Sequence, residues 1–292
     1  MIAFGSAITK PDVFDRCARA GIERVAEPDS EVVELPSAGT IFEGYNAILD
    51  RAAGLEGLEA LVLLHQDAEI VGADFCAVAR AALADPDVGV AGCAGAVGVR
   101  SIAWWEGSVT CASFVHRHDA GELPAFSWIW GDAPPYARLG EVETLDGFLL
   151  VLSPWAVRHV RFDESLGQLH GYDVDFCLQV REAGRKVLTA DFRAIHHHAL
   201  EAFSDPEGWI RAHIAVAEKW DGRMPGFGTA PGTWRERALR AEADAQTIRA
   251  VDHGKVLVLE ARARELERAL EETTTSISWK LTAPLRRARR AS

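Results

Sequence analysis

Apolar positions along residues 1–220 fall into two kinds of run. Short continuous runs are typical of strands covered on both faces, and runs with apolar residues three and four positions apart are typical of helices packed on a sheet. The predicted strands occupy residues 2–8, 32–35, 60–64, 88–94, 143–153 and 186–190. The predicted helices occupy residues 13–20, 40–53, 75–83, 172–183 and 209–220. This alternation predicts an α/β fold, a mostly parallel central sheet with helices on both faces.

The pattern loosens between residues 99 and 139. Four tryptophans occur in this stretch: Trp104, Trp105, Trp128 and Trp130. Their rings can form a platform for a sugar face, or they can fill the core of a small subdomain, and the sequence leaves both interpretations open.

A different composition begins after residue 221, so residues 1–221 are predicted to be one globular domain. Residues 222–232 are rich in Gly and Pro and are predicted to be a linker. Residues 233–275 are rich in Ala, Arg, Glu and Leu and are predicted to be a helical extension. Apolar residues keep 3–4 spacing in its second half: Val256, Leu259, Ala263, Leu266 and Leu270. A short coiled coil, which would make the chain a homo-oligomer, and a helix docked on the body both fit this pattern.

The net charge of −12 is unevenly distributed. Residues 276–292 carry +5 and no acid, which leaves −17 on the rest of the chain. An acidic body argues against nucleic-acid binding. The basic, amphipathic tail could lie on an anionic membrane surface or be solvated chain. The chain shows no secretory-signal pattern and no run approaching the roughly 20 apolar residues that span a bilayer, so we predict a cytoplasmic protein, peripheral to the cytoplasmic face of a membrane if the tail binds.

The run LVLLHQDAEI, residues 61–70, ends a predicted buried strand on polar residues. Ligands of an open α/β sheet bind beyond the carboxyl ends of its strands, so Asp67 is predicted to face a crevice. Carboxylate oxygen binds hard divalent cations, and Mn²⁺ and similar metals also accept imidazole, such as that of His65. The alternative is that the strand simply ends where it meets water.

The segment FDESLGQLHGYDVDFCLQVREAG, residues 162–184, places two acids, Asp173 and Asp175, at a predicted helix start. Exposed N–H groups and the helix dipole stabilise acids there, which explains one of them as a cap. The preceding His170 and Tyr172, on a loop with Gly171, favour the interpretation that an acid is aimed into a cleft as a general base.

Three histidines, His196, His197 and His198, follow one another at the end of a strand. Alternation puts His196 and His198 on one side of that strand and His197 on the other. A lone histidine is usually structural, whereas three at one strand end favour a metal or phosphate contact.

In chain order, YNAIL, LLHQDAEI, LDGFLLVLSPWAV, FDESLGQLHGYDVDFCLQVREAGRKV and HHH resemble the family-2-type glycosyltransferases with the GT-A fold. The closest resemblance is to the subgroup with His-Gln-Asp in place of Asp-x-Asp; it covers residues 1–220 and is strongest over 144–198. It implies a Rossmann-like GT-A domain that transfers a sugar, as an inverting hexosyltransferase, from a nucleotide-diphospho-sugar to an acceptor hydroxyl. The tail SISWKLTAPLRRARR resembles C-terminal segments of bacterial envelope-glycan enzymes, which implies a surface polysaccharide or lipid-linked glycan as acceptor.

The resemblance also implies roles for individual residues. Asp67 corresponds to the last acid of the metal-binding motif, and Asp173 to the general base that deprotonates the acceptor. His196 is the first choice, and His198 the second, to complete the shell of a divalent cation, Mn²⁺ or Mg²⁺. Nucleotide or donor contacts are implied for Asn46, His65 and Asp67, and a donor and acceptor pocket for Asp146, Gly147, His170, Tyr172 and Asp175.

Two positions depart from the family pattern. His65 replaces the first Asp of the metal motif, so metal choice and even metal dependence are open. Tyr172 replaces the Glu that usually precedes Asp173 and often helps to hold the acceptor. Two other functions remain: a sugar-nucleotide-binding protein without transferase activity, and a metal-dependent hydrolase using Asp67 and the histidines. Asp173 argues against both, because neither needs a base beside an acceptor pocket.

Overall fold

The computed structural model describes residues 1–36, 39–104, 107, 109–112, 114–118, 121–122, 139–197, 205–223, 262–276, 279 and 282. The chain divides into two compact units, Met1–Thr229 and Ala230–Ser292. The described part of the second unit is mainly a helix over residues 262–275, on which Leu266 and Leu270 are exposed. Within the described part of the chain, no helix is long and apolar enough to cross a membrane.

The first unit is built on a seven-stranded sheet of order β10-β13-β5-β12-β3-β1-β2. The strands are β1 Ile2–Ile8, β2 Glu31–Pro36, β3 Ala60–Leu64, β5 Val88–Gly92, β10 Glu141–Val142, β12 Leu149–Leu152 and β13 Lys186–Thr189. Five of them run in one direction, and only β12 and the edge strand β10 run against them. The predicted mostly parallel α/β sheet is therefore confirmed, with one antiparallel strand inside it.

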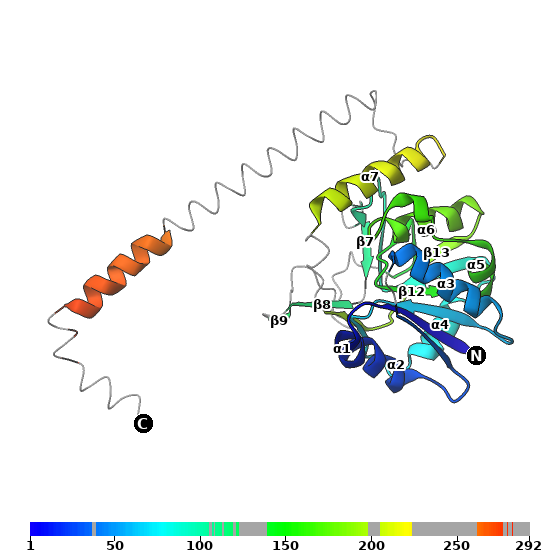
Figure 1. The fold of residues 1–292 in the computed structure, drawn as a ribbon, viewed down its shortest axis with the longest axis horizontal. Coiled ribbons are helices and arrows are strands. Elements are labelled where there is room, and N and C mark those ends of the chain that lie inside the picture. The colour runs from blue at the N-terminus through cyan, green and yellow to red at the C-terminus, as the bar shows by residue number, and fades with distance from the viewer. Residues whose placement is uncertain are drawn as a thin grey trace. The chain divides into compact units, whose positions relative to one another are not determined.

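Helices cover both faces of this sheet (Figure 1). They are α1 Pro11–Phe14, the π-helical turn η1 Asp15–Arg19, α2 Ala20–Val25, α3 Ile41–Ala53, α4 Phe75–Ala82, α5 Pro154–His159, the 3-10 turn η4 Glu164–Leu166, α6 Tyr172–Glu182 and α7 Pro206–Trp220. Neighbouring residues of β1 meet the two layers, because the ring of Phe4 packs on Phe75 of α4 while Gly5 faces Ile48 of α3. Cover on both faces explains why β3 is buried at every position and reads as one apolar run.

The first predicted helix is longer than expected. It is predicted over residues 13–20, with Gly21 next in the chain, but helical structure continues through α2 to Val25. Gly21 lies where the helix passes so close to the chain at Ile70 that a Cβ would sit 2.5 Å from the backbone nitrogen of Ile70. Glycine is used here for close packing and not as a helix stop.

Two predicted strands are each divided between two sheets. The apolar run at 88–94 forms β5 and then β6 (Ala94–Val97), and the run at 143–153 forms β11 (Thr144–Leu145) and then β12. β6 lies between β11 and β7 (Val109–Ala112) in a separate three-stranded sheet. At 88–94 periodicity does not reveal the division, because the run has no polar residue there; at 143–153 the division falls at Asp146 and Gly147.

A four-stranded sheet of order β4-β14-β8-β9 adjoins the end of β3. Its strands are β4 Ala68–Ile70, β8 Phe114–His118, β9 Gly121–Glu122 and β14 Ala194–His196. β14 pairs antiparallel with β4, so that His196 lies opposite Ala68. The amide of His197 also donates to the carbonyl oxygen of Asp67 at 2.8 Å. This pairing joins two segments that are far apart in the sequence.

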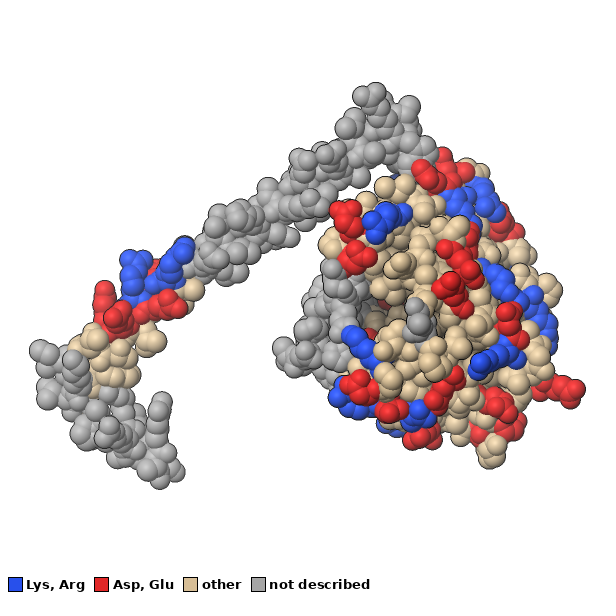
Figure 2. Space-filling view, in the orientation of Figure 1, with Lys and Arg blue, Asp and Glu red and all other residues tan. Residues whose placement is uncertain are grey.

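Charged side chains of both signs are interspersed on the surface of the first unit. On the face drawn in Figure 2, Lys and Arg lie beside Asp and Glu. Ion pairs such as Arg19–Glu34, at 2.6 Å, contribute to this distribution. The described residues of this face form no single broad basic surface.

Several predictions concern residues outside the described ranges. The residues concerned are Trp105, Trp128, Trp130, His198, residues 224–261 of the linker and helical extension, and most of the tail at 276–292. Of the cysteines predicted to be reduced, Cys17, Cys76, Cys93 and Cys177 are free and buried.

Candidate active site

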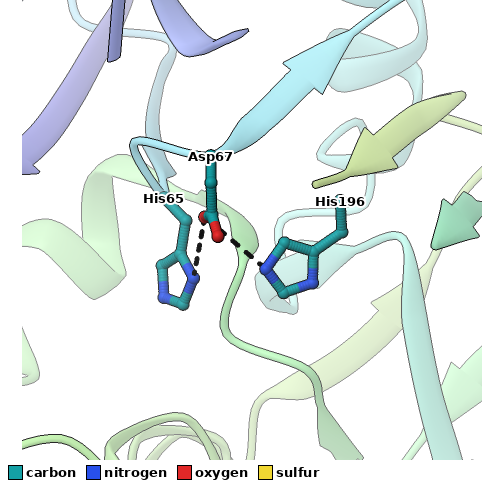
Figure 3. A group of neighbouring side chains, drawn as sticks. All are labelled: His65, Asp67 and His196. Carbon is teal, nitrogen blue, oxygen red and sulfur yellow. Dashed lines mark ion pairs between the residues drawn. The ribbon is translucent and has the colours of Figure 1, made fainter. Parts of the chain in front are cut away.

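Three side chains that can bind a metal ion meet where β3 ends (Figure 3). His65 and Asp67 follow β3, and the pairing of β14 with β4 brings His196 beside them. Asp67 Oδ1 lies 3.8 Å from His65 Nδ1 and 3.6 Å from His196 Nε2. One ligand atom from each residue lies within 4.8 Å of the other two. Two imidazoles thus flank one carboxylate, and together they offer two nitrogens and one oxygen to a cation.

The charges around Asp67 favour its ionised form. Burial raises the pKa of Asp67, but His196 and then His65 act against it and hold that pKa at about 2. Burial lowers the pKa of His196, yet the charge of Asp67 raises it above the ordinary value. Burial lowers the pKa of His65, which keeps that imidazole neutral. The Asp67 carboxylate and the neutral His65 have lone pairs for a metal ion, and His196 gains one when it releases its proton, so the donor set fits a divalent cation.

The two described histidines of the triplet point in different directions. The ring of His196 is stacked on Phe148, with centroids 4.6 Å apart, and faces Asp67. His197 faces away, with its Nε2 3.1 Å from Glu69 Oε2. These two residues follow the alternation expected from the strand. His198 lies outside the described residues, so its predicted role stays a prediction.

Asp173, in the first turn of α6, forms a second acidic group with Asp146. Its Oδ2 accepts the amide of Gly147 at 2.9 Å, and its Oδ1 accepts the amide of Val174 at 2.8 Å. Removal from water raises the pKa of Asp173 to about 7, and the negative charge of Asp146 adds to the effect. A carboxyl group with a pKa near 7 can both take up and release a proton near neutral pH.

Asp146 is held by the turn between β11 and β12. Its Oδ2 accepts Nε1 of Trp104 at 3.0 Å, and its Oδ1 accepts the amide of Phe148 at 3.2 Å. Two donors therefore hold the Asp146 carboxylate next to Asp173, which explains why its negative charge raises the pKa of Asp173.

Tyr172 links the acidic pair to the metal-binding group. It is the first residue of α6 and directly precedes Asp173, after Gly171 in the left-handed conformation (φ 78°). Its hydroxyl oxygen lies 2.5 Å from His65 Nε2. Burial raises the pKa of Tyr172 well above its ordinary value, so the hydroxyl is neutral. One turn of helix thus contacts His65 and carries Asp173.

Gly147 leaves the space that this hydroxyl occupies. A Cβ at position 147 would lie 2.2 Å from the hydroxyl oxygen of Tyr172. The ring cannot retreat, because it packs against Phe42, Tyr45 and Phe162.

Replacing Gly147→Ala is therefore expected to lower the free energy of unfolding by about 1–3 kcal/mol, the usual effect of overpacking. Urea denaturation measures the change. Gly54→Ala is the control, because a Cβ there meets only the Arg51 carbonyl oxygen at 3.6 Å. Equal unfolding midpoints for the two variants would contradict the steric argument.

Two other predicted site residues make contacts elsewhere. Asn46 Nδ2 donates to the Phe162 carbonyl and to Glu164, both at 2.9 Å, and its Oδ1 accepts the Phe162 amide at 3.0 Å. Its side chain therefore ties α3 to the segment before α6. His170 packs its ring on Trp209 of α7. The nucleotide and pocket roles of Asn46 and His170 stay predictions.

Asp175 holds α7 on α6. It is fully buried, and its Oδ1 lies 2.8 Å from both Lys219 Nζ and Trp220 Nε1. Its Oδ2 accepts Gln179 Nε2 at 2.7 Å. The predicted pocket residue thus exposes no oxygen to a sugar.

Several residues near these groups were not identified from the sequence. Gln66 Oε1 accepts the amides of Thr9 and Lys10 at 2.9 and 2.7 Å, which ties the end of β1 to the metal-binding turn. Trp104 and Phe148 support Asp146 and His196 as described above. The signals were present, since Gln66 lies inside HQD and Trp104 in the tryptophan-rich stretch, but their partners are distant in sequence.

Comparison with known proteins now gives the family. A family model described as "Glycosyltransferase like family" matches residues 3–209, which include both groups of side chains. The chain belongs to this glycosyltransferase-like family. The family resemblance predicted from the sequence is thereby confirmed.

This glycosyltransferase-like protein is also similar to one curated protein. It is 30% identical over 207 residues to the streptomycin biosynthesis protein StrF of Streptomyces griseus. The match covers 68% of this chain and 66%, just under two thirds, of StrF.

One solved structure supports the GT-A fold, and a second is a weaker match. GalNAc-T7, crystallised with UDP, GalNAc and Mn²⁺, gives a TM-score of 0.51 at 8% identity over 76% of this chain and 48% of the other. The mannosyltransferase PcManGT from Pyrobaculum calidifontis, in complex with GDP-Man and Mn²⁺, gives a TM-score of 0.41 at 14% identity over 85% and 80% of the two chains. The first likeness bears on the fold alone and agrees with the GT-A fold expected from the sequence.

Proposed function

We propose that this protein is an inverting glycosyltransferase that moves a sugar from a nucleotide-diphospho-sugar to an acceptor hydroxyl. The observation that carries the proposal is the pairing of a metal-binding group with a proton-accepting group. Asp67 lies between two imidazoles, and Asp173, with its pKa raised to about 7, lies on the helix that contacts one of them. Membership of the glycosyltransferase-like family supports the same reaction class.

Asp67 and the two imidazoles serve the donor. The diphosphate of the leaving nucleotide gains negative charge as the glycosidic bond breaks, and a divalent cation held by these residues supplies positive charge beside it. The group lies at the carboxyl end of β3, where ligands of open α/β sheets bind. Mn²⁺ is our proposed ion, supported by the UDP and Mn²⁺ present in the GalNAc-T7 structure.

Asp173 serves the acceptor. A hydroxyl is a weak nucleophile, so a carboxylate must take its proton as its oxygen attacks the anomeric carbon. The amides of Gly147 and Val174 hold this carboxylate in place. Because the attack is a single displacement, the configuration at the anomeric carbon inverts.

The proposed acceptor is a surface polysaccharide or lipid-linked glycan, handled at the cytoplasmic face of the membrane. The five basic residues of the 276–292 tail support this choice. A second candidate is a small-molecule acceptor, favoured by the similarity to a protein named for streptomycin biosynthesis.

Deleting residues 276–292 tests the first acceptor class. We expect the full chain to sediment with anionic vesicles at low salt and the truncated chain to stay in solution, since each basic residue near such a surface contributes about 1 kcal/mol. Vesicles of neutral lipid are the control. Absence of vesicle binding by the full chain would instead favour the small-molecule acceptor.

A thermal-shift screen of nucleotide sugars, with and without Mn²⁺, tests the function itself. A ligand at a hundred times its Kd stabilises the folded state by about 2.7 kcal/mol, which makes the correct donor visible. The selected donor is then offered to candidate acceptors, and the anomeric configuration of the product is read by NMR. Retention of configuration, or hydrolysis of the donor as the only reaction with every acceptor, would overturn the proposal.

A further inference from the structure

The two positions that depart from the family pattern are in direct contact. His65 stands where the metal motif has its first Asp, and Tyr172 stands where a Glu usually precedes the base. They are 107 positions apart in the sequence, yet the Tyr172 hydroxyl lies 2.5 Å from His65 Nε2. The two departures therefore form one unit of structure.

The hydroxyl of Tyr172 is held rigidly in this position. The side chain is buried, and its ring is enclosed edge-on by Phe42 and Tyr45 and packed against Phe162. Gly147 has no side chain, and the Tyr172 hydroxyl occupies the space that a Cβ at position 147 would take. Three separate segments thus cooperate to present one hydroxyl group to His65.

This contact determines which nitrogen of His65 faces Asp67. Because Nε2 is engaged by the hydroxyl, Nδ1 is the nitrogen turned toward Asp67, 3.8 Å from Oδ1. His196 approaches the same oxygen from the other side, at 3.6 Å. A hydroxyl can accept an N–H as well as donate, so it can stabilise the His65 tautomer that leaves the Nδ1 lone pair free. Metal-binding histidines commonly use their second nitrogen in this way.

We infer that Tyr172 is a positioning residue for the metal: its hydroxyl orients His65 so that His65, Asp67 and His196 together bind a transition-metal ion such as Mn²⁺ in preference to Mg²⁺. The inference rests on the proposed function, to which it adds the ligand set and the choice of ion. Imidazole nitrogen suits transition-metal ions, whereas Mg²⁺ is bound almost entirely through oxygen. Replacing a carboxylate by His65 therefore shifts the preference of the site.

The role of Tyr172 is tested by measuring Mn²⁺ binding to the full chain with calorimetry, in the presence and absence of UDP. Tyr172→Phe keeps the ring and removes the hydroxyl, and we expect Mn²⁺ affinity to fall about 10–100-fold, as for other outer-shell partners of a metal ligand. Tyr45→Phe is the matched control, because its buried hydroxyl lies one ring away and has no hydrogen-bond partner. The control should bind Mn²⁺ like the unchanged protein.

Pulsed electron paramagnetic resonance of the Mn²⁺ complex tests the ligand set directly. We expect couplings from two imidazole nitrogens in the unchanged protein and from one in His65→Ala. His65→Asp, which restores the carboxylate, should lose the preference for Mn²⁺ over Mg²⁺ in competition titrations.

A single coordinated imidazole in the unchanged protein, or unaltered Mn²⁺ affinity in Tyr172→Phe, would overturn the inference. So would absence of Mn²⁺ binding by the unchanged protein with or without UDP. The proposed function fails differently, because a chain that binds Mn²⁺ through two imidazoles and transfers no sugar would refute the transferase and leave the metal site as inferred.

Discussion

Asp173→Asn is expected to lower kcat for sugar transfer about 10²–10⁴-fold, the range lost when a general base is removed. The amide cannot accept the proton of the acceptor hydroxyl. Donor binding should be retained, because the metal-binding group is made of other residues. Steady-state kinetics and calorimetry with the donor nucleotide measure the two quantities separately, and equal turnover by the variant and the unchanged protein would refute the assignment of the base.

The pH dependence of transfer gives an independent check on the same residue. Asp173 acts when it is ionised, and its pKa is raised from 3.8 to about 7, so kcat/KM should rise with pH up to about 7 and then level off. Asp146 is the charged neighbour that raises the pKa, while the nearby hydroxyls of Tyr45 and Tyr172 are neutral because burial raises their pKa values. Asp146→Asn should therefore move the rising limb to lower pH. If kcat/KM of Asp146→Asn rises over the same pH range as in the unchanged protein, another group is responsible for the pH dependence.

The same shift has a consequence for stability. A carboxyl whose pKa is higher in the folded than in the unfolded chain favours folding in its protonated form. The contribution of Asp173 to the free energy of unfolding is therefore fully present below pH 3.8 and is lost as the pH rises toward 7. Asp173 makes the folded protein less stable at the pH at which it is useful.

Asp67→Asn is the second change with a large expected effect. It keeps the size of the side chain but removes the charge between His65 and His196. Mn²⁺ affinity should therefore fall by more than the 10–100-fold typical of changing a residue that contacts a metal ligand and not the metal itself. Transfer should fall about 10³-fold, since a bound cation contributes several kcal/mol to stabilising the transition state. Calorimetry with Mn²⁺ and transfer assays with and without a chelator measure both effects.

Asp50→Asn is the control for loss of one negative charge, because Asp50 is exposed on α3 and pairs only weakly with Arg161 at 3.3 Å. It should leave metal binding and turnover unchanged. If Asp67→Asn binds Mn²⁺ as tightly as this control, or if a chelator does not affect the unchanged protein, the metal site is refuted.

The sequence was most informative where one physical requirement determined one local pattern. The apolar run of β3 is buried on both faces, and the apolar spacing over 40–53 corresponds to α3, which the structure shows to begin with a capping box between Thr40 and Glu43. The direction of β12 could not be predicted, because a buried antiparallel strand has the same apolar run as a parallel one. The division of 88–94 between β5 and β6 could not be predicted either, because the two strands have the same apolar character.

The candidate site was predictable in its residue types but not in its contacts. HQD and HHH each suggested metal binding, and the β4–β14 pairing that brings Asp67 to His196 depends on strand registers that neither motif encodes. The contact of Tyr172 with His65 depends on where α6 begins relative to β3. Two unusual residues could be recognised from the sequence, but only the fold shows that they touch.

β4 and β14 pair in a sheet separate from the central one, so the contact between Asp67 and His196 does not depend on the hydrogen bonds of the central sheet. The seven-stranded sheet is complete at Thr189, whereas His196 arrives on the next strand, in a small sheet of its own. Opening free energies differ between parts of one protein, and loss of the β4–β14 pairing alone would separate His196 from Asp67. The amide of His197, bonded to the Asp67 carbonyl, reports this opening. Its hydrogen-exchange rate should exceed that of the β3 amides and slow when Mn²⁺ is added.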